Sequence, residues 1–426
     1  MGGVTGRLSI VINSPFPQYS GGRENWLFHV LQRLDRWGYS VTLYTCASDR
    51  PAFHDLSGLK GLRLVRVPSL RRRHRWFSLL NKATLGLAYL ADTQAFAFFG
   101  QRLLRTRLRR DDETILAMNP IIDVAPALLL KRERPRLKVA CAVRGRPAWE
   151  LSQSWPWLSW LLYRLERSTL LRSDIVLANG FDTQEYLAAR GVPSLVVPNG
   201  VDVERFRLSR TEAKEAAWLG DLKEGGCLII MMVATLMRIK GVHYLIQAAG
   251  LLRQMGAGNF RLVLVGDGSQ EPFRRQAERL GVGEHVRFAG EQRNIPAFLR
   301  WADIGVQVSE GGGMSMAALE SMAAGKALVA WDTPVYRQLV QSEVSGLLVP
   351  YHDVRALAQG LLRLMQEDGL RQELGRRAQE EAGKYDWDRV TRELVAALEL
   401  PCPAPLRHPP EADPPPAEAQ GRLYRP

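Results

Sequence analysis

The segment 311–325 combines groups that could bind a nucleoside diphosphate. Its sequence, GGGMSMAALESMAAG, joins a glycine run to small residues with helical spacing and a single carboxylate, Glu320. Glycines let a ligand approach backbone N–H groups, and a helix N-terminus carries unpaired donors suited to phosphate. Glu320 lies two turns into the predicted helix, where it could accept hydrogen bonds from ribose hydroxyls. The competing interpretation is a buried helix behind a glycine cap, with Glu320 paired to an arginine.

The position of this segment depends on the strands and helices around it. The sequence indicates these elements as short apolar runs that alternate with helical patterns. They predict an α/β fold with two Rossmann-like domains, because short buried strands separated by helices favour parallel sheets covered on both faces. Ligands bind such sheets beyond the carboxyl ends of the strands, so two facing domains would enclose a central cleft. The strands are predicted at 8–12, 41–44, 62–67, 114–118, 138–143, 175–178 and 195–197, and then at 228–234, 261–265, 286–288, 304–308 and 327–330.

Proline and glycine interrupt the pattern near 198–202, where the sequence reads PNGVD. We therefore expect the first domain at 1–198 and the second at 199–385. A helix over 386–400 is expected to cross back to the first domain. Nine of the last 26 residues are proline, which predicts a disordered tail at 401–426.

Composition narrows the function class. The chain has 426 residues, 46% of them hydrophobic, and its four cysteines form no C-x-x-C pair, so neither a disulfide framework nor a zinc ribbon is indicated. The sequence shows no signal peptide and no apolar stretch of the roughly 18 residues that a spanning helix needs. We expect a cytoplasmic protein.

Positive charge is concentrated in the basic segment, defined as residues 60–110. It holds thirteen Lys or Arg residues and one acid, Asp92, and so carries +12 of the net charge of +13. Its charges flank an aromatic-rich apolar stretch, a pattern that favours docking on an anionic membrane surface at the inner face of the membrane. The alternative to membrane docking is that the segment forms two helices of the domain whose basic ends are solvated. Nucleic acid ranks last, because no reader motif accompanies the charges.

Several motifs in a fixed order resemble those of the retaining glycosyltransferases of family 4, a group 1 family with the GT-B fold. The segment 311–325 is similar to that family's E-G-[FM]-[GS]-x-x-x-x-E-A-M-A-x-G motif, and PNGVD matches its domain junction. Further matches are SGGRE at 20–24, Lys240-Gly241, VGDG at 265–268 and GLLVP at 346–350. The resemblance implies an acceptor-binding first domain and a second domain that binds a nucleotide sugar.

The resemblance also implies how the donor is activated. Breaking the bond between sugar and diphosphate builds negative charge on the leaving group, and Lys240 is the first candidate to stabilise it. Amides near Gly313 and Met314 would add fixed donors, and the scheme requires neither a cofactor nor a metal. The alternative for Lys240 is a solvated loop cation. The predicted donor-binding set is Gly22, Lys240, Gly266, Gln292, Gly313, Met314, Ser315 and Glu320.

The sequence departs from the family pattern at the reacting centre. Thr235 stands where an arginine usually partners the lysine, Gly312 where the first glutamate belongs, and Arg144 where a histidine faces the sugar. We hypothesise that Arg238 and Glu310 reach the vacated places through shifted loops and that Arg144 supplies a cation near the diphosphate or sugar.

Two functions of different class follow. The first is a retaining transferase that moves a hexose to a cell-envelope or exopolysaccharide acceptor, including lipid-linked acceptors. The second is a catalytically silent relative that binds a nucleotide or a partner transferase. A dehydrogenase ranks below both, because 266–268 lacks the G-x-G-x-x-G spacing.

Overall fold

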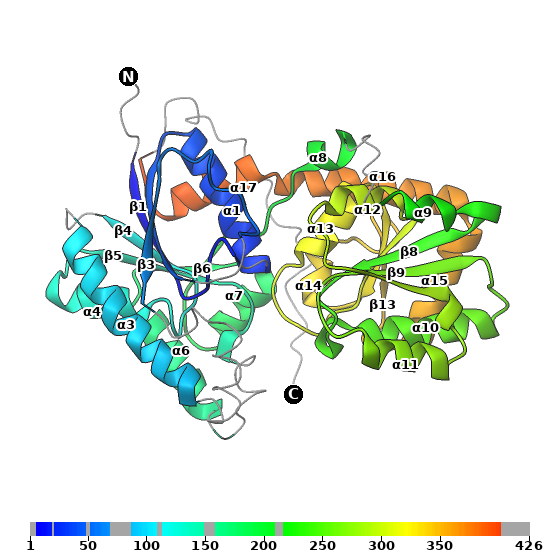
Figure 1. Ribbon diagram of the computed structural model, residues 1–426, viewed down its shortest axis with the longest axis horizontal. Helices are drawn as coiled ribbons and strands as arrows, with labels where there is room; N and C mark the ends of the chain where they lie inside the picture. Colours follow the sequence, from blue (N-terminus) through cyan, green and yellow to red (C-terminus); the bar gives the residue numbers. More distant parts are fainter. Residues whose placement is uncertain are drawn as a thin grey trace.

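The computed structural model describes residues 6–18, 21–47, 52–68, 87–108, 113–148, 157, 159–208 and 216–401. Within these residues it contains two parallel sheets, and the predicted α/β architecture of two Rossmann-like domains is confirmed (Figure 1).

The first sheet has the strand order β3-β2-β1-β4-β5-β6-β7. Successive side chains of β1 point to opposite faces of the sheet. Ile10 packs into a core with α1, whereas Val11 packs into the core on the opposite face. Both residues are fully buried, as expected for strands covered by helices on both sides. The strands are β1 (Arg7–Ile12), β2 (Ser40–Cys46), β3 (Leu62–Val67), β4 (Thr114–Ala117), β5 (Lys138–Val143), β6 (Ile175–Ala178) and β7 (Leu195–Val196).

Helices of the first domain follow its strands. They are α1 (Gly22–Arg36), α3 (Leu87–Arg107), α4 (Ala125–Glu133), α6 (Ser159–Leu170) and α7 (Phe181–Ala188).

The second sheet has the order β10-β9-β8-β11-β12-β13. Ile229 and Met231 contribute to one core while Ile230 and Met232 contribute to the other, so both faces of β8 are buried. The short strand β13 was not predicted, because three residues carry too little periodicity. The strands are β8 (Leu228–Val233), β9 (Phe260–Val265), β10 (Val286–Gly290), β11 (Ile304–Gln307), β12 (Ala327–Trp331) and β13 (Leu347–Val349).

Helices of the second domain include the one predicted from the glycine-rich segment, α13. They are α8 (Val203–Leu208), α9 (Trp218–Asp221), α10 (Val242–Gln254), α11 (Glu271–Arg279), α12 (Ile295–Trp301), α13 (Met316–Ala323), α14 (Pro334–Arg337), α15 (Val354–Gln366) and α16 (Asp368–Ala382).

The end of the described chain returns to the first domain. Helix α17 (Trp387–Ala397) packs against α1, although α16, which precedes it, packs on the second sheet (Figure 1). The Arg33 guanidinium lies 3.1 Å from the Asp388 carboxylate, which ties the two helices together. At the junction, a Cβ on Gly200 would lie 2.5 Å from the Trp387 ring, so only glycine fits there.

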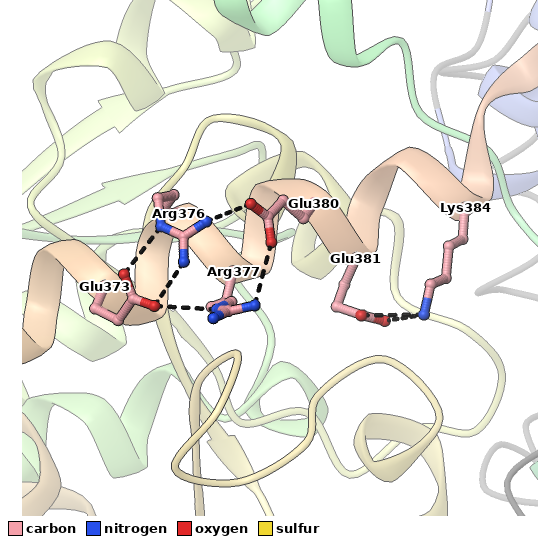
Figure 2. Close-up of polar contacts among 6 residues, drawn as sticks. All are labelled: Glu373, Arg376, Arg377, Glu380, Glu381 and Lys384. Atoms are coloured by element: carbon pink, nitrogen blue, oxygen red, sulfur yellow. Dashed lines mark hydrogen bonds and ion pairs between the residues drawn. The ribbon is translucent and has the colours of Figure 1, made fainter.

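An exposed face of α16 carries a series of ion pairs (Figure 2). Glu373 accepts from Arg376 and Arg377, and Glu380 accepts from Arg376, all at the i,i+3 or i,i+4 spacing that brings side chains together on one helix face. Hydrogen bonds from the two arginines lower the pKa of Glu373 to about 2. These charges are solvated and lie outside the cleft lining, so we assign them no part in catalysis.

Only part of the basic segment is described. Residues 69–86, 109 and 110 lie outside the described residues, and with them Arg71, Arg72, Arg73 and Arg75. On α3, Phe98 is 59% exposed while Asp92 is buried. None of the described helices combines the length and apolar character needed to cross a bilayer. Docking of this segment on a membrane stays a prediction.

Candidate functional site

A cleft of about 600 Å³ opens between the two domains, lined by residues that follow the carboxyl ends of the strands. Arg144 follows β5 and Asn179 follows β6 in the first domain; Thr235 follows β8 and Gly266 follows β9 in the second. This is where parallel sheets bind ligands, because the strand ends and the helix N-termini that follow them converge there.

Nine predicted site residues line this cleft. They come from both domains and from separate loops: Gly22, Arg144, Lys240, Gly266, Gln292, Gly313, Met314, Ser315 and Glu320. Two predicted residues, Arg238 and Glu310, are not part of the lining.

The loop before α13 is held by the first domain and by the junction between the two domains. The Gly313 N–H donates to Asp182 Oδ2 at 2.8 Å, and Asn199 Nδ2 donates to the Met314 carbonyl at 2.5 Å. Ser315 caps α13, since its Oγ accepts from the Ala318 N–H at 3.2 Å. The amide of Gly313 is therefore already engaged by a carboxylate, unlike the free phosphate donor that the sequence predicted.

Glu320 faces the cleft from α13. Burial raises the pKa of its carboxyl to about 7, and the nearby positive charge of Arg205 acts against this rise. No salt bridge joins Glu320 to an arginine within the part of the chain that the structure describes. The competing interpretation, a carboxylate merely paired to an arginine, is not realised here, and the carboxylate is left accessible to a ligand.

If Glu320 binds the ribose of a donor, its raised pKa predicts that donor binding depends on pH. Ribose hydroxyls that donate to the carboxylate favour its ionised form and so lower its pKa, which means that binding releases a proton near pH 7. We expect the affinity for an intact nucleoside diphosphate sugar to rise from pH 6 to pH 8, roughly fivefold for a one-unit fall in pKa. Calorimetric titrations between pH 6 and pH 8 measure this change in affinity. Glu320→Gln is the control, and an unchanged pH dependence in that variant would contradict the assignment.

Lys240 lines the cleft at the end of the turn after β8. Thr235, which stands in place of the expected arginine, lines it as well. Arg238 is exposed and lies outside the lining, so the structure does not place it where the missing arginine would be. Lys240 is thus the cation that the second domain contributes at this strand end.

Glu310 turns away from the cleft. Its carboxylate lies 3.5 Å from His352 Nε2, and a hydrogen bond to it helps to raise the pKa of Tyr244 to about 12, after the larger effect of burial. The backbone fixes this direction, since the Glu310 N–H donates to the Ile239 carbonyl at 2.9 Å. The structure therefore does not support the hypothesis that Glu310 replaces the carboxylate missing at Gly312.

Arg144 enters the cleft from the first domain. Its guanidinium stacks on the Trp26 ring at 4.1 Å from the centroid and donates to Asn199 Oδ1. Burial lowers the pKa of Arg144 to about 9, because a desolvated cation is disfavoured. An anionic ligand would relieve that cost, so the structure favours Arg144 as a group that meets negative charge.

An aromatic wall of the cleft was not foreseen. Phe28 stacks on His54 with ring centroids 4.5 Å apart, and Arg293 of the second domain lies over the Phe53 ring at 5.0 Å. Burial lowers the pKa of His54 to about 4, so this imidazole is neutral at pH 7. Phe28 belongs to helix α1, whereas Phe53 and His54 lie between β2 and β3, so no local pattern in the sequence indicated that these rings meet.

No cluster of three or more metal-ligating side chains occurs among the described residues. Whether the reaction needs a metal is untested, and the expectation that it needs none stays a prediction.

Two family models match consecutive parts of the chain. The model for glycosyltransferase family 4 matches residues 20–205, and the model for glycosyl transferases group 1 matches residues 221–381. Among curated proteins, the chain is 34% identical over 215 residues to a D-inositol 3-phosphate glycosyltransferase of Salinispora tropica, covering 47% of this chain and 44% of that protein. It is 29% identical over 248 residues to a phosphatidyl-myo-inositol mannosyltransferase of Mycobacterium leprae, covering 57% and 60%. The chain thus spans about half the length of the curated relatives it matches.

Solved structures share the fold over nearly the whole chain. A sucrose-phosphate synthase from Thermosynechococcus elongatus superposes with a TM-score of 0.73 at 18% identity, covering 92% of this chain and 98% of that one. An Anabaena protein solved with UDP-glucose superposes with a TM-score of 0.71 at 17% identity, covering 92% and 99%. At these identities the likeness establishes the two-domain fold.

Proposed function

Since the chain belongs to the group 1 glycosyltransferases of family 4, we propose that it transfers a hexose from a nucleoside diphosphate sugar to a cell-envelope or exopolysaccharide acceptor with retention of the anomeric configuration. The observation that carries this proposal is the meeting of Glu320, Lys240 and Arg144 in one cleft between the domains. Glu320 is a carboxylate suited to binding ribose hydroxyls, and Lys240 and Arg144 are cations suited to binding a diphosphate.

The chemistry follows from the charge that develops. As the bond between the anomeric carbon and the diphosphate oxygen breaks, the electron pair leaves with the oxygen, and the leaving group gains negative charge. Lys240 from the second domain and Arg144 from the first can stabilise that charge from two directions. The Gly313 amide contributes less, because Asp182 holds it. No cofactor or metal takes part in this scheme.

An acceptor linked to a lipid fits the first domain. Exposed aromatic side chains occur there on α3, on α6 and just before α6: Phe98 is 59% exposed, Trp160 61% and Trp157 73%. Aromatic rings at a protein surface are suited to the boundary between lipid headgroups and acyl chains. These side chains support an acceptor that is presented at a membrane surface.

The alternative is a catalytically silent relative that binds nucleotide. Gly312 and Thr235 lack the charged side chains of the family pattern, and Glu310 faces away from the cleft. Donor recognition through Glu320 and Lys240 would survive these changes, whereas transfer would not.

A donor panel separates the two functions. Uridine, guanosine and adenosine diphosphate sugars are incubated with the protein and with glycan acceptors, supplied free or linked to lipid in anionic vesicles, and released nucleoside diphosphate is measured. We expect turnover with one nucleotide class and more turnover with vesicle-bound acceptors. Tight nucleotide binding without turnover of any donor would instead favour the silent relative.

A further inference from the structure

Helix α6 has an apolar face that points to solvent. Leu161 is 46% exposed and Leu165 41%, and the helix places both on the same side as the exposed Trp160. Trp157 just before the helix and Leu171 just after it are exposed as well. The other side of α6 packs into the domain through Leu162, Glu166, Thr169 and Leu170. A surface helix usually turns polar side chains outward, so an apolar outer face indicates a partner.

The charges around this face are all positive. Three arginines of the stretch are exposed: Arg164, Arg167 and Arg172. The Arg164 guanidinium lies 5.6 Å from the centroid of the Trp160 ring. Between residues 157 and 172 the only acidic residue is Glu166, which is fully buried and accepts a hydrogen bond from the Tyr186 hydroxyl at 2.6 Å. This stretch of the surface therefore combines indole and leucine side chains with arginines and presents no carboxylate.

An anionic bilayer is the partner that this combination fits. Indole rings favour the boundary between lipid headgroups and acyl chains, and arginine stems can lie along apolar surface while the guanidinium reaches a phosphate. Each arginine close to an anionic leaflet adds attraction. A second copy of the chain fits less well, because a two-fold contact through this face would bring the same arginines near one another. The charge therefore favours lipid over self-association.

The buried side of α6 holds two segments that follow the carboxyl ends of strands. Glu166 Oε1 accepts from the N–H of Ala148 at 3.1 Å, four residues after Arg144 of the cleft lining. Thr169 Oγ1 donates to the carbonyl of Pro120, after β4, at 2.6 Å. Helix α6 thus joins an outward apolar face to a wall of the cleft, and a bilayer that binds this face would have a fixed orientation to the cleft.

We propose that α6 is an interfacial helix that lays Trp157, Trp160, Leu161 and Leu165 into the headgroup region of an anionic bilayer, and that it thereby holds the cleft next to a lipid-linked acceptor. The membrane contact follows from the surface of α6 alone, whereas its role in presenting the acceptor rests on the proposed function. The contact lies outside the basic segment, so it differs from docking through residues 60–110.

Vesicle flotation tests the contact with the full chain. We expect the protein to float with vesicles of phosphatidylglycerol and phosphatidylcholine and to stay behind with phosphatidylcholine alone. The double variant Trp160→Ser with Leu161→Ser should lower the partition coefficient at least about tenfold, because two apolar side chains no longer enter the bilayer. Arg164→Gln should lower it roughly fivefold, which corresponds to about 1 kcal/mol for one arginine near an anionic surface.

Two controls locate the contact. Leu280→Ser changes a leucine of the second domain that is 43% exposed, close to the exposure of Leu161, and should leave flotation unchanged. Phe98→Ser removes an exposed ring of the basic segment on α3. Loss of flotation in Phe98→Ser with none in the α6 double variant would assign docking to the basic segment and overturn the inference. Thermal unfolding checks that each variant is folded.

Flotation without donor keeps this test separate from the proposed function. A chain that ignores anionic vesicles, or floats equally with neutral ones, overturns the inference even if it transfers a hexose to free acceptors. A dimer in light scattering that the α6 double variant converts to a monomer would then assign the face to self-association. A chain that floats through α6 but turns over no donor supports the contact and defeats only the proposed function.

An active chain allows a further measurement of the role of α6. The ratio of turnover with vesicle-bound acceptor to turnover with free acceptor should fall in the α6 double variant, because the cleft is no longer held at the bilayer. An unchanged ratio overturns the role of α6 in presenting the acceptor.

Discussion

Replacing Lys240 with alanine is expected to lower kcat about a hundredfold. The lysine lines the cleft at the end of the turn after β8, where the leaving diphosphate would develop its charge. Removing one preorganised donor from such a site costs about 3 kcal/mol in the barrier, which corresponds to a factor of roughly one hundred. Steady-state release of nucleoside diphosphate from the productive donor measures the effect.

Arg238→Ala is the matched comparison for Lys240→Ala. Arg238 is a cation two residues away in the same turn, but it is exposed and outside the cleft lining. Its removal should change kcat by less than about threefold, since a solvated surface charge contributes little. A normal kcat in Lys240→Ala, or equal losses in the two variants, would show that the cation in this turn does not act through contact with the diphosphate.

The pattern of strands and helices could be predicted from sequence because it depends on the periodicity of neighbouring residues. The alternation of Ile229 to Met232 between two cores is a property of neighbouring residues, and the helix after the glycine run shows the same local character. Motif order likewise predicted that Gly22, Lys240 and Glu320, which lie far apart in sequence, line one cleft. The strand-end rule needs no knowledge of side-chain contacts.

Side-chain directions at the reacting centre could not be predicted in this way. Glu310 was expected in the cleft on the basis of distance along the chain, but a backbone hydrogen bond to Ile239 and the proximity of His352 turn it aside. The partners of the glycine loop, Asp182 and Arg146, come from another domain and more than a hundred residues away. Contacts between domains leave no periodic trace in sequence, so these residues were missed.

Gly241→Ala is expected to destabilise the second domain by about 3 kcal/mol or more. Gly241 has a φ of 82°, and a Cβ at this position would lie 2.0 Å from the carbonyl oxygen of Val308. The left-handed backbone alone costs a non-glycine residue about 1–2 kcal/mol, and relief of the overlap must separate the Lys240 turn from the end of β11. Urea unfolding followed by circular dichroism measures the loss, and kcat should fall with it because Lys240 moves.

The control lies at the other end of the same helix. Gly256, just after α10, has a φ of 85°, yet a Cβ there would meet no atom within 4 Å. Gly256→Ala therefore bears the backbone cost of about 1–2 kcal/mol without the overlap, and it should leave kcat unchanged. The difference between the two variants isolates the contact between the Lys240 turn and Val308. Equal destabilisation would mean that this contact relaxes freely, and the position of Lys240 would then not depend on the close approach of the two backbones.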